Sequence, residues 1–245
     1  MNHAYRQASR SPRYSLLFAL PLLVFYQVLA VAVPAGPQGG VRNGADVLLQ
    51  SAFAWLAGSW GPRLFMACLI VAGLWFVAKD LRANPGRLRA AVFGLMLAES
   101  IGLALIFGIV VGGLTAALLG APPPPLTLIA GVQTQLSRGT VLMLSLGAGI
   151  YEELLFRVLL VGLFAWIGRR VLGFRPLIAG TGAAIVGALI FSAFHYIGPF
   201  GDPWQLYSFV FRTIAGLFFS ALYLTRGFGI TAWTHALYDV FLVFR

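Results

Sequence analysis

The chain has 245 residues, of which 60% are hydrophobic and only 10% are charged, and its mean hydropathy is +0.88. A soluble globular domain carries about 25% charged residues, so this composition excludes a soluble protein. It predicts an all-α integral membrane protein, a polytopic helical bundle of about seven or eight transmembrane helices. The net charge of +10 does not indicate nucleic-acid binding, because 16 of the 17 basic residues are arginines spread over short loops. Cationic loops on the cytoplasmic side explain that pattern.

Seven apolar runs approach or exceed the roughly 20 helical residues that cross a bilayer. In chain order we expect spans at Ser15–Val33, Leu64–Ala78, Ala90–Leu119, Thr140–Ile167, Leu177–Tyr196, Leu206–Leu224 and Phe228–Phe244. The first has no clear small-residue cleavage site after it, so we interpret it as a retained helix and not a signal peptide. The second is short and the third long, which predicts tilt or a break. Val47–Trp60 is a short apolar run, either an interfacial or re-entrant helix or an eighth span.

Two breaks interrupt these runs. A glycine- and proline-rich stretch at 35–40 ends the first span, and the run Pro122 to Pro125 cannot be crossed by a helix. The proline run divides one membrane domain into two parts. Residues 1–121 hold N-terminal transmembrane helices without an assigned role, and residues 122–245 form a helical core that carries the polar motifs.

The distribution of bases predicts the orientation of the chain. With seven spans and the N-terminus inside, the inner segments carry 11 basic residues and the outer segments carry 4. This asymmetry supports an inside N-terminus. An eighth span at Val47–Trp60 would reverse every later helix, so the sequence leaves open which face of the membrane the motifs meet.

Three short patterns of ionisable residues lie within the C-terminal apolar runs, where charge is expensive and usually marks function. They are Glu152-Glu153-x-x-x-Arg157, Phe191-x-x-x-His195 and His235-x-x-x-Asp239. They contain three of the seven acids and two of the three histidines of the chain. Each pattern alone is weak evidence, but three in order on three predicted membrane helices indicate one polar site.

The first pattern separates its two acids. Glu153 and Arg157 lie four residues apart, so they share a helix face and can form an ion pair, which favours a structural role. Glu152 lies about 100° away on a helix with 3.6 residues per turn. Glu152 is therefore free to face a cavity and to act as a general base or acid.

The second and third patterns place histidines on helix faces. Phe191 lies one turn before His195 and has no chemistry of its own, so it either walls a pocket or simply packs. His235 and Asp239 share a face, where the carboxylate can fix the imidazole tautomer or the pair can contribute to an oxyanion pocket.

Arg212 falls within the sixth predicted span and needs a partner there. We expect that partner to be Glu153, Asp239 or Glu99, in preference to a carboxylate of the substrate, because buried charges are normally matched.

The three patterns resemble those of the CAAX-protease and bacteriocin-processing family (CPBP, or Abi) of intramembrane endopeptidases, which includes the type II CAAX prenyl proteases. The resemblance covers Ser145 to Phe241. It implies a glutamate-dependent peptidase in the membrane, without a cofactor, acting on a membrane-associated peptide or protein near its terminus.

The resemblance also implies roles for individual residues. Glu152 with His195 would activate the attacking water, and His235 with Asp239 would bind the oxyanion. Glu153 and Arg157 would support them. Eukaryotic members tend to carry Asn at the position of Asp239, so Asp239 would have to be protonated or to act by orienting His235.

Two alternatives stay open. Glu152, His195 and His235 could hold a catalytic zinc ion, although the H-E-x-x-H pattern of many zinc peptidases is missing. The protein could instead be a non-catalytic scaffold, a bacteriocin-immunity protein or a transporter with a proton relay. The bias toward Ala, Gly and Arg suggests a bacterial inner membrane. The substrate is not readable, and a prenylated CAAX tail is only the best-known target of the family.

Overall fold

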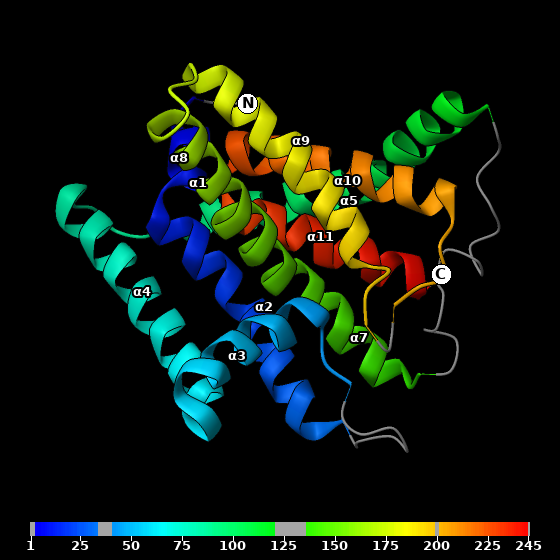
Figure 1. The fold of residues 1–245 in the computed structure, drawn as a ribbon. Coiled ribbons are helices and arrows are strands. Elements are labelled where there is room, and N and C mark those ends of the chain that lie inside the picture. The colour runs from blue at the N-terminus through cyan, green and yellow to red at the C-terminus, as the bar shows by residue number, and fades with distance from the viewer. Residues whose placement is uncertain (1–2, 34–40, 121–135, 199–200, 245) are drawn as a thin grey trace.

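The computed structural model describes residues 3–33, 41–120, 136–198 and 201–244, and within these ranges it is entirely helical and irregular, without strands (Figure 1). The glycine- and proline-rich stretch at 35–40, the run Pro122 to Pro125 and Arg245 lie outside the described residues. In chain order the elements are α1 (His3–Arg10), α2 (Pro12–Ala32), α3 (Gly44–Ala57), η1 (Gly58–Trp60), α4 (Gly61–Ala83), α5 (Ala90–Leu119), α7 (Arg138–Gly147), η3 (Ala148–Val161), α8 (Gly162–Arg170), α9 (Pro176–Phe194), α10 (Leu206–Arg226) and α11 (Phe228–Val243).

The predicted membrane bundle is confirmed. Five segments are long and apolar enough to cross a membrane, namely Pro12–Ala32, Gly44–Ala83, Ala90–Leu119, Pro176–Phe194 and Leu206–Arg226. The count of seven or eight spans stays a prediction. α5 has the predicted bounds. The expected span Thr140–Ile167 runs through three consecutive helices, α7, η3 and α8. The short helix α1 was not predicted.

Local sequence signals explain several helix starts. Pro12 and Pro176 stand in the first turns of α2 and α9, where the backbone N–H that proline lacks would have no partner within the helix. The side chain of Asn43 accepts from the backbone N–H groups of Ala45 and Asp46 and so caps α3. Ser137 caps α7 in the same way.

Gly147 and Gly149 let neighbouring elements pack closely against the central helix η3 and its start. A Cβ atom at Gly149 would lie 2.4 Å from the carbonyl oxygen of Ala232 in α11. A Cβ atom at Gly147 would lie 2.6 Å from the ring of Tyr26 in α2 and 2.7 Å from Cβ of Asn43. Small residues let membrane helices pack closely in this way. Both α11 and the start of α3 therefore come directly against the helix that carries the two glutamates.

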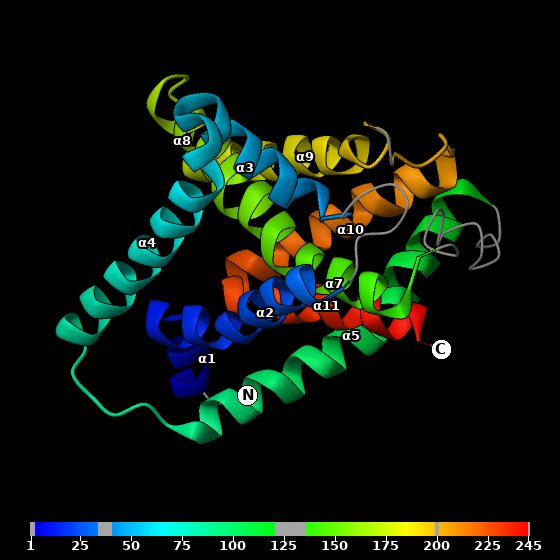
Figure 2. The same ribbon diagram turned by 90° about the horizontal axis from the view of Figure 1, so that it is seen from below.

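The outer surface of the bundle is apolar. Figure 2 shows α4 and α5 at the border of the molecule. Large side chains such as Val71, Leu74 and Ile109 are more than half exposed there. A bilayer accommodates such a surface, and the buried polar groups lie on the inner faces.

Ion pairs tie several helix ends together at one end of the bundle. Arg13 at the start of α2 lies 3.5 Å from Asp80 near the end of α4. Arg226 at the end of α10 makes two bonds, of 2.6 and 2.7 Å, to Glu99 of α5, which also accepts from Tyr5 of α1. Glu99 is therefore paired with Arg226 at the end of α10, whereas Arg212 lies near the start of that helix.

Candidate active site

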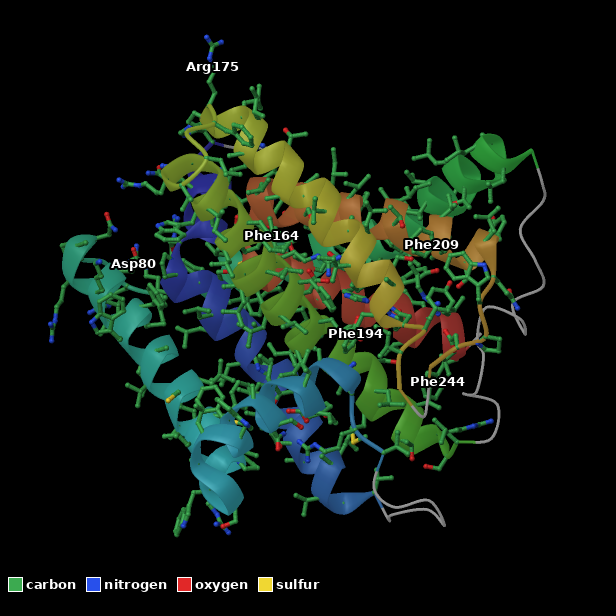
Figure 3. All side chains as sticks on the ribbon, viewed as in Figure 1. Asp80, Phe164, Arg175, Phe194, Phe209 and Phe244 are labelled. Atoms are coloured by element: carbon green, nitrogen blue, oxygen red, sulfur yellow. The ribbon has the colours of Figure 1, made fainter. Side chains whose placement is uncertain are left out.

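The three motifs converge on the inner faces of η3, α9 and α11. Figure 3 marks Phe194 at the end of α9 and Phe209 near the start of α10, and these two helix ends lie together. The hydroxyl of Ser192 donates to the carbonyl oxygen of Phe209 over 2.7 Å. The contact of Gly149 with α11 brings the third motif to the same place.

The carboxylate of Glu152 lies between an amide and an imidazole. Its Oε1 accepts from Nδ2 of Asn43 over 2.8 Å. Its Oε2 lies 3.9 Å from Nε2 of His195 and has no hydrogen-bond partner among the described residues. That distance is too long for a direct hydrogen bond. One oxygen of Glu152 is thus held by the protein, and the other is directed at His195 without being bound to it.

The tautomer of His195 follows from its second contact. Nδ1 lies 2.8 Å from the carbonyl oxygen of Phe191. A carbonyl oxygen can only accept, so Nδ1 carries the proton in the neutral ring and Nε2 presents a lone pair. Two acceptors, Nε2 of His195 and Oε2 of Glu152, therefore face each other.

Glu153 forms the buried centre of a second pair of contacts. Its Oε2 lies 3.2 Å from Nε of Arg157, so the predicted ion pair is present. Its Oε1 lies 2.7 Å from Nδ1 of His235. The side chains of Glu153 and Arg157 are 0% and 1% exposed. The acid is matched on both sides, as a charge in an apolar interior has to be.

His235 is held by contacts on its edge and on its face. Its Nε2 lies 3.8 Å from Oδ2 of Asp239, and its ring stacks on Phe219 with centroids 4.4 Å apart. Asp239 is 29% exposed at its side chain, against 7% for His235. His235 therefore stands between two carboxylates, one buried and one accessible.

Phe191 packs between the two imidazoles. Its ring centroid lies 4.9 Å from that of His195 and 6.2 Å from that of His235, both edge to face. The guanidinium carbon of Arg157 lies 4.3 Å from the same ring. Phe191 is buried and separates the catalytic candidates, which makes it a wall of the site.

Arg212 pairs with an acid of the chain, as predicted, but the three acids named as candidates were wrong. Its partner is Asp202, in the segment before α10, and not Glu153, Asp239 or Glu99. The physical reason is a turn that the sequence pattern did not predict. The backbone N–H of Asp202 donates to the carbonyl oxygen of His195 over 2.8 Å, which holds Asp202 beside the end of α9 and within reach of Arg212.

The prediction of an ordinary α-helix for the first motif was also wrong. Ala148–Val161 is a π-helix, with bonds from i to i+5. The angular offset of 100° between the two glutamates does not apply to this geometry. They still serve different partners, and the i, i+4 pair of Glu153 with Arg157 survives. π-Bulges within helices are frequent at functional sites.

Sequence analysis missed Asn43, which belongs to the N-terminal part. Its amide is buried and touches Glu152. An available signal was its position before an apolar run, where Asn is a preferred N-cap. That signal predicts a helix start and says nothing of a residue more than one hundred positions away.

No group of three or more His, Cys, Asp or Glu side chains that could hold a metal ion occurs among residues 3–33, 41–120, 136–198 and 201–244. His235 has a carboxylate beside each ring nitrogen, at 2.7 and 3.8 Å. The zinc alternative, with Glu152, His195 and His235 as ligands, stays a question for experiment.

Residues 134–241 match the family model described as Rce1-like, type II CAAX prenyl endopeptidase. The matched segment contains all three motifs and leaves out α1 to α5. No curated protein and no solved structure matches the chain.

We predict that Arg157→Met destabilises the bundle more than Arg212→Met. The first change leaves Glu153 buried without its cation, and loss of one partner of a buried pair costs about 3–5 kcal/mol. The Arg212–Asp202 pair is more exposed, with side chains 15% and 24% accessible. Thermal unfolding in detergent measures the difference, and equal midpoints for the two variants would contradict this account of Glu153.

Proposed function

We propose that the chain, whose residues 134–241 match the Rce1-like model of type II CAAX prenyl endopeptidases, cleaves membrane-associated peptides or proteins with water activated by Glu152 and His195. Membership of the family implies a peptidase of the CAAX type that is embedded in the membrane. The catalytic mechanism and the substrate are our proposal. The expected resemblance to the CAAX-protease family is confirmed by the match of residues 134–241.

One observation carries the mechanism: Oε2 of Glu152 and Nε2 of His195 face each other at 3.9 Å. Both are acceptors in the tautomer that Phe191 fixes. A water molecule that donates one proton to each atom would satisfy both, and polar contacts longer than 3.5 Å often include such a water. This arrangement aims the lone pairs of the water oxygen away from both groups.

The chemical step then balances with these residues alone. The carboxylate of Glu152 takes a proton from the water, and the water oxygen bonds to the carbonyl carbon of the scissile peptide. The C–N bond breaks, and the leaving nitrogen takes up the proton held by Glu152. General acid–base assistance of this kind contributes about 10²- to 10⁴-fold to a rate.

His235 supports the oxyanion that forms in this step. Nδ1 stays bonded to Glu153, and a proton on Nε2 would point to the side of Asp239. Asp239 then acts by orienting the imidazole or in its protonated form, because an ionised carboxylate would repel the oxyanion. An oriented donor at this position stabilises the charge as it develops.

We predict that Glu152→Gln lowers cleavage by about 10²- to 10⁴-fold, because an amide cannot accept the proton of the water. The readout is cleavage of co-expressed candidate membrane peptides, compared with wild type, Glu152→Ala and His195→Ala. Glu99→Gln is the matched control, since it makes the same change at an acid of α5 far from the motifs. Full activity in Glu152→Gln would favour a scaffold or an immunity protein.

We predict that chelators leave cleavage unchanged. Water activation by Glu152 and His195 needs no metal ion, so phenanthroline should not reduce the rate of the purified protein. The control is a non-chelating isomer of phenanthroline at the same concentration. Loss of activity that added zinc restores would refute this mechanism in favour of the zinc alternative.

A further inference from the structure

Eleven of the 17 basic residues of the chain lie at one end of the bundle, called here the arginine-rich end. It consists of α1, the starts of α2, α5 and α9, and the ends of α4, α8 and α10. Its bases are Arg6, Arg10, Arg13, Lys79, Arg82, Arg87, Arg89, Arg169, Arg170, Arg175 and Arg226. Figures 1 and 2 show α1 and α8 toward the left, away from the C-terminus.

Printed contacts join these helix ends to one another. Arg13 meets Asp80, which brings the start of α2 to the end of α4. The backbone N–H of Arg89 donates to the hydroxyl of Tyr14 over 2.9 Å, which adds the start of α5. Gly229 donates to Ser15 over 2.7 Å, which adds the start of α11.

The more exposed side chains of the candidate active site lie toward the opposite end. His195 follows the last turn of α9, whose 19 residues rise about 28 Å from Arg175. That length is close to the 30 Å of a hydrocarbon core. The side chains of His195 and Asp239 are 24% and 29% exposed, whereas that of Glu152 is 10% exposed. Access therefore runs past His195 and Asp239, where α9 and α11 end.

Helix α3 does not reverse this orientation. It begins at Asn43, which contacts Glu152, and it ends beside the start of α4. The ring of Phe65 in α4 contacts Phe53 of α3 edge to face and Tyr151 of η3 at a tilt, with centroids 5.4 and 6.2 Å apart. Both ends of α3 thus lie on the side of the active site, and α4 alone returns the chain to Asp80.

We propose that the active site is reached from the non-cytoplasmic face and takes peptides whose cleavage segment lies on that face. The proposal rests on the proteolytic function above. Eleven bases stand at the arginine-rich end, against Arg42, Arg63 and Arg138 at the other, and basic loops stay in the cytoplasm. A substrate tail confined to the cytoplasm would have to cross the bilayer to reach Glu152.

Single cysteines test the orientation. Cys68, exposed on α4, is first changed to Ser. Pro203→Cys then marks the α9–α10 connection, and Gly86→Cys marks the α4–α5 connection, both at exposed positions. In intact bacterial cells, a membrane-impermeant maleimide should label Pro203→Cys and should label Gly86→Cys only after permeabilisation. The reverse pattern would overturn the proposal.

A second experiment, with peptide substrates, tests the orientation separately from the proteolytic function. A library of single-span anchored peptides is built in both orientations and co-expressed with wild type or Glu152→Gln. Glu152-dependent cleavage only of peptides that face outward is expected. Glu152-dependent cleavage only of inward-facing peptides would contradict the proposed orientation but support the proteolytic function. If no peptide is cleaved, the cysteine labelling still decides the orientation.

A second inference comes from an independent observation, the geometry of Asn43. Its Oδ1 accepts from the backbone N–H groups of Ala45 and Asp46 at 2.9 and 3.4 Å. This fixes which way the amide points, so that Nδ2 must face Glu152, 2.8 Å away. The backbone N–H of Asn43 also donates to the hydroxyl of Tyr26.

The surroundings of Asn43 hold it rigidly. The hydroxyl of Tyr26 donates to Asp46 over 2.7 Å, and Asp46 accepts from Arg42 over the same distance. Asn43 is buried, and Gly147 leaves room for it against η3. An amide fixed in this way holds Oε1 of Glu152 and directs Oε2 toward His195.

We infer that Asn43 is a positioning residue for Glu152, supplied by the N-terminal part of the chain. Asn43→Ser keeps an N-cap but removes the donor, and Asn43→Asp keeps the cap but puts a carboxylate against Glu152. A hydrogen bond to a charged group corresponds to about 10- to 100-fold in rate. We expect a loss of that size in Asn43→Ser and a larger loss in Asn43→Asp.

The pH–rate profile distinguishes positioning from a structural role. The amide favours the ionised carboxylate, so the acid limb should move to higher pH in Asn43→Ser and further in Asn43→Asp. Asn84→Ser is the matched control, since it removes an amide donor to Asp80, 2.9 Å away, at the arginine-rich end. An unmoved acid limb in both Asn43 variants would overturn the inference, while activity retained in Glu152→Gln would overturn the protease itself.

Discussion

Pairing of buried charge is the constraint on which the site depends. Glu153 is fully buried, and its two oxygens meet Arg157 of its own helix and His235 of α11. A charge in an apolar interior is tolerated only when it is matched. The contact with His235 also joins η3 to α11, so the pairing that makes a buried Glu153 tolerable also places the second histidine of the site.

Close packing then brings the remaining groups into reach. Gly147 and Gly149 lie five and three residues before Glu152, and they allow Tyr26, Asn43 and α11 to approach η3 more closely than any side chain would permit. The matched segment 134–241 is therefore not a self-contained site. An element encoded a hundred residues earlier supplies the amide that binds the carboxylate of Glu152.

Local features were predictable from the sequence, and contacts between distant residues were not. Apolar length predicted α5 to the residue, and the spacing of four predicted the pair of Glu153 with Arg157. Nothing in a hydropathy pattern reports the turn that carries Asp202 to Arg212, because that turn depends on a backbone bond to His195. The π-helix was missed for a related reason: its backbone pattern has no signature in residue type.

The exposed fraction of the side chains increases across the site, and this gradient makes a hydrolytic reaction compatible with a membrane interior. The ion pair of Glu153 with Arg157 is completely enclosed, Glu152 is slightly exposed, and His195 and Asp239 are about a quarter exposed. In the proposed mechanism, water and substrate reach Glu152 and His195 from the end where α9 and α11 stop, while the ion pair of Glu153 with Arg157 stays out of contact with solvent. Water beside Glu153 would weaken its pairing with Arg157 and His235, whereas the proposed reaction needs water beside His195.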